Sequence, residues 1–193
     1  GVGAAIAGAK PVIDLHFADF IGIAMDEVLK QMAKAHYMFG GQATMSLVLR
    51  APDGLMKHGA AQHSQSLETW FTNIPGIRVV VPSTPANGKQ LLKAAIKDPN
   101  PVICDVPEDL PPIDLSRAEV VCEGADVTLV SYGLMLTKAL AAADVARREY
   151  GVSVEVIDLR SITPLDMPTI YASVKKTGHL VIAHEAIKIG GVG

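Results

Sequence analysis

The chain alternates short apolar runs with longer segments of helical character, and this alternation restricts its fold more than any other feature. Strands are expected at residues 11–15, 45–49, 77–81, 101–106, 127–131, 152–157 and 179–183. Helices are expected at residues 2–9, 20–38, 64–72, 86–97, 135–149 and 166–176, with Ser64 or Ser66 capping the helix at 64–72. Strands that alternate with helices are typical of an α/β fold with mainly parallel sheets.

The core of this fold must be aliphatic, because 49% of the 193 residues are hydrophobic and only 5% are aromatic. The net charge of −3 gives no electrostatic reason to expect a nucleic-acid partner. No apolar run reaches the length of a membrane span, and the first residues lack the basic start of a signal peptide. Cys104 and Cys122 lie in or beside apolar runs, so we expect buried thiols in a reducing compartment rather than a disulfide.

A Pro-rich acidic stretch divides the chain. Residues 107–112 read Pro-Glu-Asp-Leu-Pro-Pro, which is the composition of a linker. We therefore predict a first domain over residues 1–110, a linker over 111–120 and a second domain over 121–193. Both ends of the chain look cut, so we expect it to be part of a longer polypeptide whose second domain continues.

Three local patterns are candidates for chemistry. The sequence holds no P-loop, no nucleophile elbow, no dinucleotide fingerprint after a strand and no zinc spacing. The first pattern places His63 among small and polar residues, beyond the strand expected at 45–49. Open parallel sheets bind ligands at the carboxyl edge of their strands, and histidine exchanges protons near neutral pH. His63 is therefore either a proton-transfer residue or a histidine that satisfies a local hydrogen bond.

The second pattern sets two aromatic residues, Phe17 and Phe20, at a strand-to-helix junction in an aromatic-poor chain. A flat ring at such a junction can stack on a heterocycle, because it lies at the edge of the sheet where ligands bind. The other interpretation is an anchor of the hydrophobic core. The residues alone leave both interpretations open.

The third pattern lies where the helix expected at 86–97 ends, just before the next strand. The last carbonyls of a helix have no partner within the helix, and Asp98 and Asn100 follow them directly. Oxygen atoms of this kind can surround a hard cation. An ordinary capped turn has the same sequence pattern.

Short motifs spread over the whole chain stand in the order and spacing of a known family. They are F-A-D-F at 17–20, Y-M-F-G-G-Q at 37–42, Q-H-S-Q-S at 62–66, P-G-I-R-V-V-V-P-S at 75–83, K-A-A-I-K-D at 93–98, I-D-L-R-S-I-T-P-L-D at 157–166, H-E-A at 184–186 and G-G at 190–191. With these motifs the chain resembles the β subunits of the thiamine diphosphate-dependent decarboxylating component of 2-oxo acid dehydrogenase complexes.

The resemblance implies a parallel-sheet pyrimidine-binding domain followed by a transketolase C-terminal-like α/β domain. It implies oxidative decarboxylation of a 2-oxo acid, with transfer of the acyl group to lipoamide. Thiamine diphosphate is then shared with an α subunit, which holds the diphosphate and most of the contacts to Mg²⁺. The further implied partners are a second β subunit, in a heterotetramer, and the lipoyl-bearing acyltransferase core.

The resemblance also assigns roles to residues at matching positions. Phe20 stacks on the aminopyrimidine ring of the cofactor, and His63 acts as general acid or base and helps to pass the acyl group to lipoamide. The resemblance further implies a structural K⁺ site formed by Leu47, Ala95, Ile96, Asp98 and Asn100.

Two departures from the family pattern restrict these implications. The family's glutamate that hydrogen-bonds the aminopyrimidine lies upstream of the first residue here, and neither Asp14 nor Asp19 matches its position. Residues 105–109 are acidic where the family often carries a basic and aromatic stretch. This second departure leaves the substrate class and the partner contacts open.

Three other interpretations remain. Residues 25–42 and the residues before His63 are similar to acetoin dehydrogenase β subunits as well, so acetoin cleavage is the nearest alternative to the oxidation of pyruvate or a branched-chain 2-oxo acid. A non-catalytic core fragment kept for assembly and a single-chain transketolase-like enzyme are the others. We expect the protein in the cytoplasm, or in the mitochondrial matrix if the source is eukaryotic.

Overall fold

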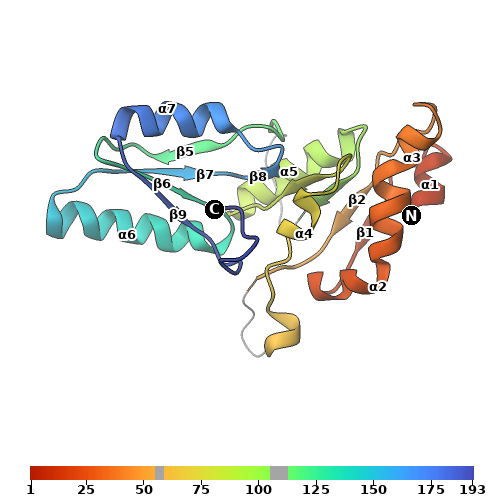
Figure 1. Ribbon diagram of the computed structural model, residues 1–193, viewed down its shortest axis with the longest axis horizontal. Helices are drawn as coiled ribbons and strands as arrows, with labels where there is room; N and C mark the ends of the chain where they lie inside the picture. The colour runs from red at the N-terminus through yellow and green to blue at the C-terminus, as the bar shows by residue number, and fades with distance from the viewer. Residues whose placement is uncertain (55–58, 105–112) are drawn as a thin grey trace.

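The chain forms two α/β units that lie side by side, each around its own sheet (Figure 1). The computed structural model describes residues 1–54, 59–104 and 113–193. The first sheet has the strand order β1-β2-β4-β3-β8, and the second has the order β5-β7-β6-β9. All neighbouring strands are parallel except for the pairs β3·β8 and β5·β7, so the expected α/β fold with mainly parallel sheets is confirmed.

Four short parallel strands build most of the first sheet: β1 (Val12–Asp14), β2 (Val48–Arg50), β3 (Arg78–Val80) and β4 (Val102–Cys104). Each lies within or beside the run of apolar residues expected for it. Alternate side chains of these strands point to opposite faces, as the pleat requires. Val48, Val80 and Val102 pack against helix α5 (Pro85–Lys97) on one face. Helix α5 begins at Thr84, whose hydroxyl accepts a hydrogen bond from the Asn87 amide at 3.1 Å.

The opposite face of the first sheet is covered by the N-terminal helical segments. These are α1 (Val2–Ile6), the 3-10 turn η1 (Ala18–Phe20), α2 (Ile21–Asp26), the π-helical stretch η2 (Glu27–Met32), α3 (Ala33–Met38) and α4 (Thr69–Thr72). The predicted helix over 20–38 is therefore helical throughout, with a wider middle turn. The prediction for 64–72 is wrong in its first half, because residues 64–67, which follow the 3-10 turn η3 (Ala61–His63), form no regular secondary structure. Helix α4 begins after Glu68, so neither Ser64 nor Ser66 caps it.

The second sheet is sandwiched between two long helices. Helix α6 (Leu134–Tyr150) covers one face and α7 (Met167–Thr177) covers the other (Figure 1). The strands between them are β5 (Glu119–Cys122), β6 (Val127–Ser131), β7 (Val154–Asp158) and β9 (Leu180–Ala183). Strand β5 was not predicted, and it begins at the end of the segment 111–120 that we expected to be linker. Residues 105–112, with the acidic stretch and the Pro-rich part of that linker, lie outside the described residues.

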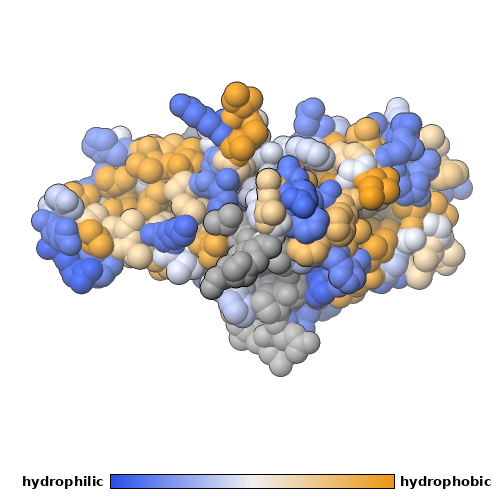
Figure 2. All heavy atoms as spheres, turned by 90° about the horizontal axis from the view of Figure 1, so that it is seen from below, coloured by the Kyte–Doolittle hydropathy of each residue, from blue (hydrophilic) through white to orange (hydrophobic). Residues whose placement is uncertain are grey.

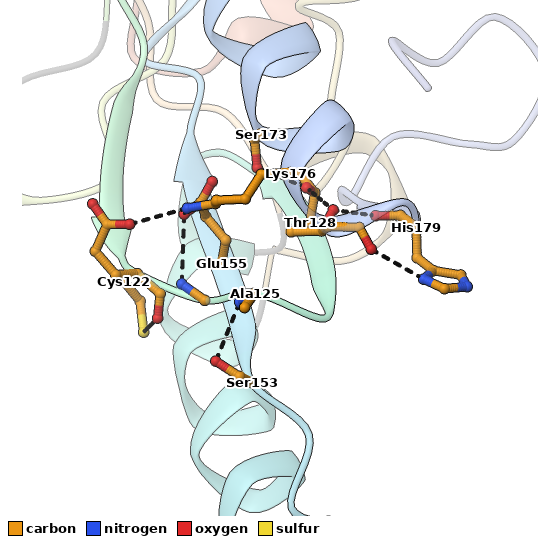
Figure 3. A network of polar contacts seen from close by, with 11 residues as sticks. Cys122, Ala125, Thr128, Ser153, Glu155, Ser173, Lys176 and His179 are labelled. Atoms are coloured by element: carbon orange, nitrogen blue, oxygen red, sulfur yellow. Dashed lines mark hydrogen bonds and ion pairs between the residues drawn. The ribbon is translucent and has the colours of Figure 1, made fainter.

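A polar network fixes α7 on the second sheet (Figure 3). The carboxylate of Glu155 on β7 is buried and contacts the ammonium of Lys176, which also lies 3.2 Å from the carboxylate of Glu123. The hydroxyl of Thr128 lies 2.6 Å from that of Ser173 and 2.7 Å from the hydroxyl of Thr177. Because each buried polar group has a partner, α7 can pack over polar strand positions without the cost of unpaired groups.

A short strand that was not predicted from the sequence, β8 (Ser161–Thr163), joins the two units. It leaves the second unit and pairs antiparallel with β3 at the edge of the first sheet, where Val79 faces Thr163. One cluster of buried side chains therefore continues from Val79 to Ile157 and Ile162 without interruption. The relative placement of the two units is thus fixed by a shared core as well as by strand pairing.

Asp158, at the end of β7, is fully buried at this junction and receives three hydrogen bonds. The donors are the Ser83 hydroxyl at 2.7 Å, the Asn87 side-chain amide at 3.0 Å and the Arg160 backbone amide at 3.2 Å. Burial raises the pKa of Asp158 to about 6, although these donors oppose the shift. The carboxylate joins the loop after β3 and the start of α5 to the second sheet.

We expect Asp158→Ala to lower the free energy of unfolding by about 2 kcal/mol, because it leaves buried donors from Ser83 and Asn87 without an acceptor. Asp158→Asn is the matched control, since its amide oxygen still accepts hydrogen bonds and the loss should be about half as large. Urea denaturation of the three proteins measures both values. Equal stability of the alanine variant and the wild type would contradict this role.

Two further expectations concern the thiols and the membrane. Cys122 is a free thiol, as expected, but the expectation that it is buried is wrong, because the residue is only half-buried. Its sulfur lies 3.8 Å from the carbonyl oxygen of Glu123. Strand β5 is an edge strand of the second sheet, which explains why its residues are not fully covered. Within the described residues, no helix is long and apolar enough to cross a membrane.

Candidate functional site

The candidate site lies at the carboxyl edge of the first sheet, the edge at which we expected His63 and Phe20. Strand β1 ends at Asp14 and β2 ends at Arg50, and the guanidinium of Arg50 donates to both carboxylate oxygens of Asp14, at 3.1 and 2.7 Å. This hydrogen-bonded pair lowers the pKa of Asp14, so the carboxylate is held as an anion. Asp14 is therefore engaged by Arg50 at the edge of the sheet.

Three aromatic rings meet just beyond this edge. The ring of His63 stacks on that of Phe17, with centroids 4.5 Å apart and an angle of 19° between the planes. Phe20 meets both rings edge-on, at 5.3 Å from His63 and 5.5 Å from Phe17. We call Phe17, Phe20 and His63 the ring cluster. It brings together two patterns that lie more than forty residues apart in the sequence.

The ring cluster is not part of the hydrophobic core. Phe20 is 40% exposed, and the side chains of Phe17 and His63 are half-buried. An anchor of the core would be covered, so this exposure argues against that interpretation of Phe20. An exposed aromatic face beside an imidazole can stack on a planar ligand and exchange a proton with it.

The orientation of His63 is set by its own backbone. It ends the short turn η3, which begins after Ala60, a residue held at a φ of +53°. The Nδ1 atom lies 2.6 Å from the carbonyl oxygen of Gln62. A carbonyl only accepts hydrogen bonds, so Nδ1 carries the proton of this bond and the neutral ring has its free lone pair at Nε2.

A hydrogen bond between side chains ties the two halves of the ring cluster together. The amide of Gln65 donates to the carboxylate of Asp19 at 2.6 Å. Asp19 lies between Phe17 and Phe20, and Gln65 lies two residues after His63. Neither residue was predicted to have a role, and in the structure both connect the two segments.

A cavity of about 160 Å³, which the sequence did not predict, lies beside the ring cluster and is lined in part by Ala18, Ile21 and Ser66. Apolar residues of the first unit line most of it, together with the acidic residues Asp53, Glu68 and Glu185 and the ring of Tyr132. The Tyr132 hydroxyl donates to a carboxylate oxygen of Glu68 at 2.7 Å, and both residues are about 5% exposed. Burial and the negative charge of Glu68 raise the pKa of Asp53 to about 7.

The signal for these residues in the sequence was faint. Asp53 precedes Gly54 and reads as part of a turn, and Glu68 sits in a segment that reads as an exposed helix start. Tyr132 directly follows a buried strand of the second sheet. Only the pairing of the two units brings the three side chains together, so local pattern alone does not reveal them.

The residues assigned to a cation by resemblance also lie near one another. The backbone amide of Asp98 donates to the carbonyls of Ala94 and Ala95 at 3.0 and 3.2 Å, and the Ser46 hydroxyl donates to the Asp98 carbonyl at 2.7 Å. The Asp98 carboxylate accepts from Asn100 and lies 3.0 Å from the Arg78 guanidinium. This carboxylate is thus occupied by protein partners, and any cation here would be held by the backbone carbonyls.

Side-chain metal centres are not evident in the described ranges. Within residues 1–54, 59–104 and 113–193, no three His, Cys, Asp or Glu side chains are grouped so that they could hold a metal ion. The chemistry that these residues offer is therefore ring stacking and proton exchange at the ring cluster, with a buried acid pair behind it.

Comparison with known proteins agrees with this architecture. The family model "Transketolase, pyrimidine binding domain" matches residues 1–112, and "Transketolase, C-terminal domain" matches residues 116–193. A solved structure described as a split gene transketolase, an inactive beta4 tetramer, aligns with a TM-score of 0.83 at 27% sequence identity. The alignment covers 99% of this chain and 62% of that one.

Several relatives are more similar in sequence. The subunit beta of acetoin:2,6-dichlorophenolindophenol oxidoreductase from Cupriavidus necator is 45% identical over 96% of this chain and 58% of its own length. The pyruvate dehydrogenase E1 component subunit beta of Rhizobium meliloti and the mitochondrial 2-oxoisovalerate dehydrogenase subunit beta of Chaetomium thermophilum are each 42% identical. Each of these two alignments covers 100% of this chain and 44% of the relative.

The chain spans about half the length of the curated relatives that it matches. Both family models nevertheless match in the order in which the two sheets occur, and together they cover nearly all residues. The chain therefore belongs to the family that joins a transketolase pyrimidine-binding domain to a transketolase C-terminal domain, together with the β subunits of pyruvate, 2-oxoisovalerate and acetoin dehydrogenases.

Proposed function

We propose that this chain is the core of a β subunit that, with an α subunit, oxidatively decarboxylates a 2-oxo acid and transfers the acyl group to lipoamide. The observation that carries the proposal is the ring cluster: His63 stacked on Phe17 at the carboxyl edge of the first sheet, with Phe20 edge-on and open to solvent. This arrangement offers a proton carrier beside an aromatic surface, in a family of thiamine diphosphate enzymes.

The residues present fit one part of thiamine diphosphate. The exposed ring of Phe20 suits the flat aminopyrimidine, whereas the described residues offer no cluster of acidic side chains for a metal ion. We assign the diphosphate and Mg²⁺ to the α subunit. When bound, the cofactor supplies the electron sink for decarboxylation.

His63 is the proposed acid–base residue of this chain. Its Nδ1–H is held by the carbonyl of Gln62, so Nε2 is the atom that takes up or delivers a proton. Asp19 and Asp14 are engaged by Gln65 and Arg50, which supports giving neither of them the role of the family's glutamate. Phe17 holds the imidazole plane by stacking.

The proposed substrate is pyruvate or a branched-chain 2-oxo acid, and acetoin is the alternative favoured by one observation. The relative with 45% identity is named for acetoin, whereas the pyruvate and 2-oxoisovalerate relatives named above stand at 42%.

The function is tested by reductive acylation. The full-length β subunit is combined with its α subunit, and mass spectrometry follows acylation of a lipoyl domain with pyruvate, a branched-chain 2-oxo acid or acetoin. Release of CO₂ with acylation supports a 2-oxo acid dehydrogenase, and release of acetaldehyde from acetoin supports the alternative. If none of the three substrates leads to acylation of the lipoyl domain, the enzyme assignment is contradicted and a non-catalytic subunit is favoured.

Partners are proposed on the same basis. Large hydrophobic side chains stay exposed on the N-terminal helices, among them Ile23, Tyr37 and Phe39, and hydrophobic residues reach the surface over both units (Figure 2). We propose that such surfaces contact the α subunit and a second β subunit. We further propose that the acyl group passes to the lipoyl group of an acyltransferase core. We place the enzyme in a bacterial cytoplasm or a mitochondrial matrix, because the relatives include mitochondrial proteins.

Two structural assignments belong to this proposal. The boundaries 1–110, 111–120 and 121–193 are retained for the two domains and their linker, with β8 as an arm of the second domain on the first sheet. A structural K⁺ is assigned to the carbonyls near Leu47, Ala95 and Ile96, with Asp98 and Asn100 closing the turn. The proximity of the chain before β2 to the end of α5 supports this placement, since the Ser46 hydroxyl donates to the Asp98 carbonyl at 2.7 Å.

Phe20→Ala should weaken thiamine diphosphate binding by the assembled enzyme about tenfold, because it removes the exposed ring that we assign to the aminopyrimidine. Phe20→Tyr keeps the ring and should bind within about threefold of the wild type. Calorimetric titration of both variants measures the dissociation constants. An alanine variant with wild-type affinity would rule out stacking on Phe20.

A further inference from the structure

We propose that Asp53, Glu68 and Tyr132 form a positioning device that holds the His63 segment and connects its placement to the second unit. The segment is defined here by its described residues 59–66. The inference rests on the proposed function, because it gives these residues a role in presenting His63. The three residues act through the backbone, because Asp53 accepts from the amides of Gly54 and Leu67 and Glu68 follows Leu67 directly.

Asp53 joins the chain after β2 to the residue that follows the segment. Its carboxylate accepts from the Gly54 amide at 2.7 Å before the segment and from the Leu67 amide, at 3.1 Å to the nearer oxygen, after it. The Gly54 amide also donates to the Gln65 carbonyl at 2.9 Å. Residues 53 and 54 are therefore joined to the end of the segment, at residues 65–67, by one side chain and one backbone hydrogen bond.

Glu68 connects this clamp to the second unit. It follows Leu67 directly, and its carboxylate accepts the hydroxyl proton of Tyr132, which comes directly after β6. Burial and the negative charge of Glu68 raise the pKa of Asp53, so the two acids are also linked electrostatically.

The surroundings leave little room for the clamp to shift. Gly54 is buried at a φ of +89°, and a Cβ atom there would lie 2.9 Å from a carboxylate oxygen of Glu185. Tyr132 stacks on His184, with ring centroids 5.9 Å apart. The charged and titratable groups that face the acid pair are therefore Tyr132 and Glu185 from the second unit, with His184 behind the tyrosine.

This arrangement explains why a family member would bury an acid pair beside a reactive histidine. A buried polar network with every member satisfied has one preferred geometry, whereas an apolar contact tolerates sliding. A shift of about an ångström at a reacting group lowers rates severely. The network thus fixes the position of the His63 imidazole when the two units pack together.

Two variants break the device and one restores it. Tyr132→Phe removes the donor to Glu68, and Glu68→Ala removes the connection altogether. Glu68→Gln is the conservative rescue, because its amide oxygen accepts from Tyr132 while its NH₂ group donates to Asp53. Tyr150→Phe and Glu149→Gln, on the exposed end of α6, are matched controls.

The experiment uses the full-length subunit assembled with its α subunit and has two readouts. Hydrogen exchange should become roughly tenfold faster at the amides of Gly54, Leu67 and residues 59–66 in Tyr132→Phe and Glu68→Ala, while α6 amides remain unchanged. The kcat for acyl transfer should fall roughly tenfold in the same two variants with KM within about twofold, and Glu68→Gln and both controls should keep wild-type values.

The two readouts separate the inference from the proposed function. An enzyme inactive on every substrate overturns the function, and hydrogen exchange still decides whether the clamp exists. Wild-type exchange and kcat in Tyr132→Phe would overturn the positioning role even if Glu68→Ala fails to fold. Faster exchange that Glu68→Gln does not restore would overturn it as well, because the geometry of the hydrogen bonds would then not be what holds the segment.

Discussion

His63→Ala is expected to slow acyl transfer to lipoamide roughly 10²-fold or more in the assembled enzyme, because it removes the proposed proton carrier. The substitution also removes one partner of the stacked pair with Phe17, but the backbone clamp at Asp53 and Gly54 stays intact. We therefore expect the fold and the cofactor affinity to change little. Single-turnover acylation of a lipoyl domain, followed by mass spectrometry, measures the effect.

His16→Ala is the matched control for this experiment. His16 is an exposed histidine next to Phe17, outside the ring cluster, and its removal should leave the acyl-transfer rate within about twofold of the wild type. Unchanged acyl transfer in His63→Ala would remove the catalytic assignment. A loss of rate in both variants would point to a general disturbance of this edge of the sheet.

The free energy of unfolding is expected to fall as the pH rises from about 5 to 7, by about 1 kcal/mol per pH unit. The cause is Asp53, whose pKa is raised to about 7 by burial and by the charge of Glu68. The native state thus holds a proton that the unfolded chain has already released, since an unfolded aspartate has a pKa of about 3.9. Stability is fully present below the unfolded pKa and is lost as the pH passes through the folded one.

Asp53→Asn separates this contribution from that of Asp158, whose pKa is also raised by burial, to about 6. The asparagine resembles the protonated acid, because its oxygen accepts from Leu67 and its NH₂ group can donate to Glu68. Urea denaturation at several pH values should therefore show a flatter slope between pH 6 and 7 for the variant. The same slope in both proteins would contradict the raised pKa of Asp53.

The sequence predicts most of the elements because each strand is a short apolar run between clear breaks. The strand expected at 127–131 coincides with β6, and the helix expected at 86–97 agrees with α5 to within one residue. The strands β5 and β8 were not predicted because polar residues interrupt their short apolar stretches: β5 reads Glu-Val-Val-Cys and β8 reads Ser-Ile-Thr. Pairing between distant segments, rather than local pattern, makes them strands.

The site was predictable only in part for the same reason. Phe20 and His63 stand out locally, and the structure brings them within 5.3 Å between ring centroids. Asp53 and Glu68 read as surface residues, because nothing near them in sequence shows that Tyr132 will cover them. A buried acid pair depends on the docking of two units, which no single stretch of sequence encodes.

The central claim is that the ring cluster of this chain is one wall of a cofactor site completed by an α subunit. Titration of thiamine diphosphate with Mg²⁺ into the β subunit alone, the α subunit alone and their complex tests it most directly. We predict strong binding by the complex only, weakened about tenfold by Phe20→Ala in this chain. Binding by the α subunit alone with the affinity of the complex, insensitive to Phe20, would contradict the claim.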